Sequence, residues 1–199
     1  MNKRDIFIAA IAVTLVLTIS IAYANVFVYA PIQAQLQPVN PPVYFDQGSN
    51  AGKPDLGPNN NIVVSVGPNK ESLNVTIHPT YQTTYYENIS IVINSDNKAY
   101  YVYFRVQTAA SLPTGSIAWL CVYNSNATRS LTGWPVPSPT GYQLCVNLLQ
   151  SGLNNNYITL NANSKVELDV YIYIPEGTSP SSTSAQLHLI YTPTAETPP

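Results

Sequence analysis

The feature that most constrains the fold is a strict alternation of apolar and polar residues at positions 165–175. Every even-numbered residue from Val166 to Ile174 is aliphatic, and the residues between them are acidic or tyrosine. Successive side chains of a β-strand point to opposite faces, so the pattern predicts a strand with one buried face. We expect Glu167 and Asp169 to lie on its solvated outer face.

Other short alternating or apolar stretches follow residue 60, separated by Gly, Pro and Asn turns. They cover residues 61–67, 72–78, 87–94, 98–108, 116–123, 142–149, 157–161 and 184–192. About nine such strands with no helix among them predict an all-β fold, an antiparallel β-sandwich of Ig-like or jelly-roll type. We place this domain at residues 61–192 and a flexible Pro/Thr tail at 193–199.

The N-terminus has the pattern of a signal peptide. Lys3 and Arg4 precede an apolar run over residues 6–22, and Ala22-Tyr23-Ala24 is a small-x-small cleavage site. We expect residues 1–24 to form a signal helix that is removed, so that membrane contact is limited to this segment before cleavage. The alternative is a retained membrane helix, because the run approaches the spanning length. Both interpretations place the remaining chain outside the cell.

Residues 25–37 form an isolated period-two segment. Its even positions are all apolar: Val26, Val28, Ala30, Ile32, Ala34 and Leu36. The pattern predicts a strand with one buried face. Pro31 interrupts it, because proline has no N–H to donate to a neighbouring strand. A linker rich in Pro, Gly and Asn, residues 38–60, separates this segment from the predicted sandwich.

A detached apolar strand can complete the sheet of another copy or fold back as the first strand of its own domain. In the first case its backbone pairs with an open sheet edge and its apolar side chains fill the core. Such a contact is head-to-tail and generates a filament when it does not close. The sequence leaves both alternatives open.

Charged residues are 9% of the chain and the net charge is -2, which disfavours nucleic-acid binding. Cys121 and Cys145 predict a disulfide in an exported chain, with two free thiols as the alternative. Asn74, Asn88 and Asn126 each begin an N-x-S/T sequon and are candidate sites for N-linked glycans. Asn126 is the best candidate, because it lies in a polar loop.

No convergent set of catalytic residues is apparent. His78 and His188 are far apart in sequence, and we expect both to be exposed. A blue-copper site is excluded, because Met1 is the only methionine. Glu167 and Asp169 could form a glycosidase pair or a calcium site, but nothing else converges on them. We therefore expect no enzymatic activity, metal or cofactor.

Four tyrosines alternate with aliphatic residues and are expected on outer faces: Tyr101, Tyr103, Tyr171 and Tyr173. They are consistent with protein contacts or with ordinary β-propensity.

The export signal, the apolar segment 25–37 and the stretch NANSKVELDVYIYIPEG at 161–177 together resemble archaeal extracellular filament subunits. These are the thread and bundling-pilus proteins, related in fold to the TasA/camelysin biofilm-fibre group. The stretch 161–177 is similar to the late strand and turn of that family. The resemblance implies a β-sandwich whose N-terminal segment is donated to the next subunit, so that the partner is a further copy in a homopolymer.

The sequence thus favours a cell-surface filament subunit, active in adhesion or biofilm. The alternative is a monomeric surface domain that is anchored in the membrane and binds a glycan or a protein. A secreted hydrolase is a weaker hypothesis, because no metalloprotease residues of the camelysin type are found.

Overall fold

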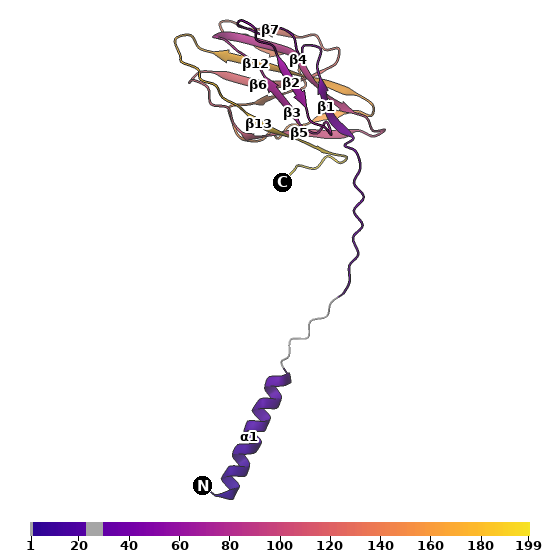
Figure 1. Ribbon diagram of the computed structural model, residues 1–199, viewed down its shortest axis with the longest axis vertical. Coiled ribbons are helices and arrows are strands. Elements are labelled where there is room, and N and C mark those ends of the chain that lie inside the picture. Colours follow the sequence, from indigo (N-terminus) through magenta and orange to yellow (C-terminus); the bar gives the residue numbers. More distant parts are fainter. Residues whose placement is uncertain (1, 23–29) are drawn as a thin grey trace. The chain divides into compact units, whose positions relative to one another are not determined.

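The computed structural model describes residues 2–22 and 30–199, which divide into the units Met1–Pro38 and Val39–Pro199 (Figure 1). The first unit contains helix α1, Lys3–Ala22, over the apolar run. No helix in the described residues has both the length and the apolar character that crossing a membrane requires. The second unit contains all the strands found in residues 2–22 and 30–199, and we call it the β domain.

Five antiparallel strands form the larger sheet of the β domain. Their order is β1 (Val43–Gln47), β4 (Gln82–Asn94), β12 (Lys165–Ile174), β6 (Ile117–Asn124) and β9 (Leu144–Asn147). The strand with the cleanest alternation, β12, is central and pairs with β4 on one side and β6 on the other. The all-β fold with antiparallel sheets is therefore confirmed.

The smaller sheet is built around β5, Tyr100–Thr108. Its Val102 is paired with Ile158 on one side and with Tyr191 on the other. The flanking strands are β10 (Gly152–Leu153) and β11 (Ile158–Leu160) along one side of β5, and β13 (Gln186–Thr192) along the other. Two separate hairpins complete the domain: β2 (Val63–Val66) with β3 (Leu73–Thr76), and β7 (Ser130–Thr132) with β8 (Ser138–Thr140).

The main core contains side chains from both sheets. Val92 and Leu168 of the larger sheet belong to the same buried cluster as Val102 and Phe104 of the smaller one. A second cluster lies where Val64 of the β2–β3 hairpin packs with the end of β12. Burial of each Val, Leu or Phe side chain stabilises the fold by about 1.5–3 kcal/mol.

The predicted linker 38–60 contains a strand, which corrects our placement of the domain boundary. β1 pairs with β4 along its whole length, from Val43 opposite Asn94 to Gln47 opposite Ser90. Val43 is buried in the main core, and Phe45 packs against it. The prolines and glycines on either side of this short stretch hid its alternation, so the β domain begins at Val39 rather than near residue 61.

The expectation of a solvated outer face on β12 is wrong. Asp169 is 0% and Glu167 only 8% exposed. The reason is the long connection from β6 to β9, residues 125–143, which contacts that face through the carbonyl of Pro137 and the side chain of Arg129. Tyr171 is buried beneath this connection, and Tyr103 of the smaller sheet is buried as well, so these two tyrosines are not free contact surface.

Candidate assembly interface

The apolar, even-numbered side chains of the N-terminal segment 25–37 are exposed wherever the structure describes them. Residues 30–37 have no regular secondary structure. Ile32 is 92% and Leu36 88% exposed, and Ala30 and Ala34 are exposed too. Val26 and Val28 lie outside the described residues. Two large aliphatic side chains of the same parity are therefore available for burial on a partner.

An incoming strand needs a sheet edge with free backbone groups. The β1 edge is partly used, because the Phe45 N–H donates to the Lys70 carbonyl at 2.8 Å. The edges formed by β9, β10 and β11 are only two to four residues long. β13 has seven residues and pairs with β5 alone among the described strands. It is the longest open edge in the described part of the chain.

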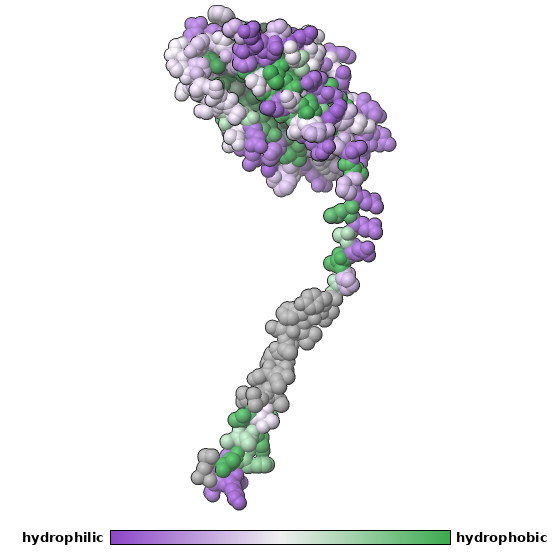
Figure 2. All heavy atoms as spheres, viewed as in Figure 1, coloured by the Kyte–Doolittle hydropathy of each residue, from purple (hydrophilic) through white to green (hydrophobic). Residues whose placement is uncertain are grey.

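The apolar side chains of β13 that pack against the main core remain partly exposed to solvent. Leu187, Leu189 and Tyr191 pack against the main core but are only half-buried. In Figure 2, apolar residues gather on the face of the domain around β2, β3 and β13. A further strand along β13 could bury this apolar surface and satisfy the backbone of the edge. The β13 edge is therefore our candidate acceptor site.

The predicted disulfide is confirmed. Cys121 of β6 and Cys145 of β9 occupy directly opposed positions and are bonded, with a Cα–Cα distance of 4.1 Å. The bond therefore closes the base of the β6–β9 connection. It lies on the outer face of the sheet, since Cys121 is also opposite Asp169 of β12.

Replacing both cysteines with alanine is expected to lower the free energy of unfolding by about 3 kcal/mol, because the unfolded chain regains the freedom of the closed loop. Urea unfolding of the variant and of the oxidised parent measures this difference. Addition of a reducing agent should bring the parent to the stability of the variant and leave the variant unchanged. Equal stability of parent and variant would contradict a structural role for the bond.

Two of the three sequons are accessible in the folded chain. Asn74 on β3 and Asn126 in the turn after β6 are exposed. Asn88 is half-buried at a positive φ of 43°, and the hydroxyl of Ser90 in the same sequon is buried, donating to the Asp46 carbonyl. Glycosylation remains a prediction, and the geometry favours Asn74 and Asn126.

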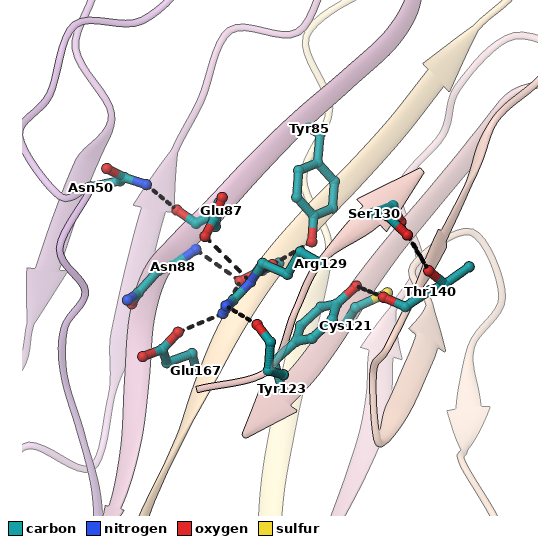
Figure 3. Close-up of polar contacts among 12 residues, drawn as sticks. Asn50, Tyr85, Glu87, Asn88, Cys121, Tyr123, Arg129, Ser130, Thr140 and Glu167 are labelled. Atoms are coloured by element: carbon teal, nitrogen blue, oxygen red, sulfur yellow. Dashed lines mark hydrogen bonds and ion pairs between the residues drawn. The ribbon is translucent and has the colours of Figure 1, made fainter. Parts of the chain in front are cut away.

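Sequence reasoning missed a cluster of buried charges on the outer face of the larger sheet (Figure 3). The Arg129 guanidinium donates from Nε to Asp169 Oδ2 at 2.8 Å and from Nη2 to Glu167 Oε2 at 2.5 Å. Asp169 also accepts the Tyr85 hydroxyl and, at 2.8 Å, the Asn88 backbone N–H. The only charged side chain of the connection is thus paired with the two carboxylates that it covers.

The pKa values in this cluster follow from burial and pairing. Burial alone would lower the pKa of Arg129, but hydrogen bonds to Asp169 and Glu167 raise it well above its usual range. Burial, together with the hydrogen bond to Asp169, raises the pKa of the Tyr85 hydroxyl. Arg129 is therefore permanently charged, and Tyr85 stays a neutral donor. A lone arginine in an otherwise uncharged loop was the available signal in the sequence.

The two histidines are not brought together. His78 lies beside Asp55, whose carboxylate is 1% exposed and accepts the His78 backbone N–H at 2.7 Å. Burial raises the pKa of Asp55, but hydrogen bonds from Leu56 and His78 outweigh it and hold the pKa below its ordinary value. His188 is exposed on β13. Among the described residues, no three His, Cys, Asp or Glu side chains are placed to hold a metal ion.

The chain was compared with known proteins. No protein-family model matches it, and neither does any curated protein.

Proposed function

We propose that this chain is a structural subunit of an extracellular filament, a β-sandwich whose residues 25–37 add a strand to the β domain of a neighbouring copy. The observation that carries the proposal is the exposure of Ile32 and Leu36 on one parity of an extended segment. Such side chains are stabilised by burial in a partner, and the period-two spacing suits a strand rather than a helix.

The β13 edge supports the same proposal from the acceptor side. A donated strand would gain main-chain hydrogen bonds along β13 and apolar contacts near Leu187 and Leu189. The donor segment and the acceptor edge are different surfaces, so the contact is heterologous and can repeat without closing. From Leu36 to Val43 the chain spans at most about 25 Å, so consecutive β domains would lie close together.

The proposal includes export and a surface location. The disulfide is consistent with an oxidising compartment. The signal-like residues 1–24 supply the export route, and Asn74 and Asn126 are the sites where N-linked glycans would be attached. N-terminal sequencing of the mature protein should begin at Asn25.

Electron microscopy and light scattering test the proposal. The mature chain should form long fibres, and deletion of residues 25–37 should leave a monomer with an unchanged melting temperature. A synthetic peptide of residues 25–37 should bind this monomer, because the acceptor edge remains free. Fibres formed by the deleted chain would contradict donation of this segment.

A further inference from the structure

The β6–β9 connection is fixed to the larger sheet by a disulfide, by ion pairs and by a cation–π contact. The Cys121–Cys145 disulfide closes its base, and Arg129 is fixed by two buried carboxylates (Figure 3). The Arg129 guanidinium also lies over the Tyr123 ring, 4.6 Å from its centroid. The connection therefore has one defined position on the sheet.

Hydrogen bonds to backbone carbonyls fix the far part of the same connection. The Tyr123 hydroxyl donates to the Thr140 carbonyl at 3.2 Å, and the Tyr171 hydroxyl donates to the Pro137 carbonyl. Gly141 has a positive φ of 82°, and a Cβ there would lie 2.4 Å from the Thr128 carbonyl oxygen. Only glycine allows the two arms of the connection to approach this closely.

The tip of this anchored hairpin presents a tryptophan to solvent. Residues 133–137 read Gly-Trp-Pro-Val-Pro, between β7 and β8. Trp134 is 91% exposed, about twice the exposure of any other large hydrophobic side chain described in the β domain from β1 onward. The two prolines restrict the tip backbone, so binding through Trp134 would cost little conformational entropy.

The chemistry around Trp134 selects against charged ligands. Between Val122 and Leu144 the only charged residue is Arg129, whose side chain is 11% exposed and paired with two carboxylates. The exposed side chains of β7 are Ser130, Leu131 and Thr132, so the hairpin offers hydroxyl groups and no charge beside the tip. Phosphate groups of nucleic acid or anionic lipid would find no free cation on this hairpin. A neutral sugar offers C–H groups that stack on an indole ring and hydroxyls that pair with these polar groups.

We propose that the β7–β8 hairpin is a binding site for neutral saccharides, with Trp134 as the stacking platform. The site is independent of the proposed filament, because it involves neither residues 25–37 nor β13. In a filament, however, it would repeat with every subunit and act by multivalency, so that a weak contact per copy could still hold a polysaccharide surface.

Tryptophan fluorescence of the full chain tests the proposal, with maltohexaose, cellohexaose, mannohexaose and N-acetylchitohexaose as probes. The variant Trp119→Phe leaves Trp134 as the sole tryptophan, so that its emission reports the tip alone. We expect at least one probe to change this emission saturably. We expect Trp134→Ala to weaken binding of that probe roughly tenfold or more, measured by calorimetry. The melting temperature should not change, because Trp134 is exposed.

The control variant is Tyr157→Ala, which removes an exposed aromatic of the β domain outside this hairpin. It should bind the same probe as the parent does. Absence of a response to all four oligosaccharides would overturn the proposal. So would equal binding by Trp134→Ala, or binding through Trp134 to phosphatidylglycerol vesicles instead of sugars.

Discussion

Replacing Ile32 and Leu36 together with aspartate is expected to abolish fibre formation and leave the β domain folded. Both side chains are almost fully exposed in the single chain, so the substitution removes no contact of the β domain itself. In a donated strand each would be buried, at about 1.5–3 kcal/mol per side chain. The buried aspartates would add a desolvation penalty to this loss. Negative-stain microscopy and light scattering measure the outcome.

The matched control is Gln33→Asp with Gln35→Asp, which adds the same charge on the opposite parity of the segment. This control should still assemble, because its aspartates would face solvent in a donated strand. If both double variants lost assembly equally, the added charge alone would explain the loss of fibres. That result would contradict a donated strand with one buried face.

The Ile32→Asp, Leu36→Asp chain keeps its β13 edge, so it should still accept a strand from a wild-type neighbour. Small amounts mixed into wild-type protein should therefore cap growing fibres and shorten them. Unchanged fibre lengths would show that the variant is not incorporated, which would contradict separate donor and acceptor surfaces.

Replacing Arg129 with methionine is expected to lower the free energy of unfolding by about 3–5 kcal/mol, the usual effect of removing one partner of a buried ion pair. Glu167 and Asp169 would remain beneath the connection without a cation, and their desolvation would no longer be offset. Urea unfolding of variant and parent measures the difference.

Lys70→Met is the control, because Lys70 pairs with Asp46 at 2.9 Å and the two side chains are 48% and 40% exposed. Solvent screens such pairs, so the control should unfold at nearly the parent urea concentration. The triple variant Arg129→Met, Glu167→Gln, Asp169→Asn should recover part of the lost stability, since no unpaired charge remains. A small effect of Arg129→Met alone would show that water reaches the two carboxylates.

Much of the fold could be predicted, because a half-buried strand shows as a local alternation of apolar and polar residues in the sequence. The alternation from Val166 to Ile174 places one row of aliphatic side chains in the core whatever the strand pairs with. The disulfide could also be predicted from the sequence, because Cys121 and Cys145 are the only cysteines of the chain. The apolar parity of residues 25–37 could be identified in the same way, although its partner could not.

β1 and the charged cluster could not be predicted, because each depends on contacts between distant residues. The five residues of β1 become a strand only where β4 supplies hydrogen-bond partners 43 to 51 residues later in the chain, with Val43 opposite Asn94 and Gln47 opposite Ser90. The β13 edge likewise became visible only when its pairing with β5 alone was known.

The sequence by itself determined which side chains of each strand share a face, because strand geometry alternates them at every residue. Only the tertiary structure decided which faces are covered. In an isolated sheet, the polar side chains of β12 would be exposed to water. Here they are buried, because the connection closed by the Cys121–Cys145 disulfide crosses that face and places Arg129 against Asp169. Burial depends on long-range packing, so a local alternation cannot distinguish a solvated carboxylate from one that is paired beneath a loop.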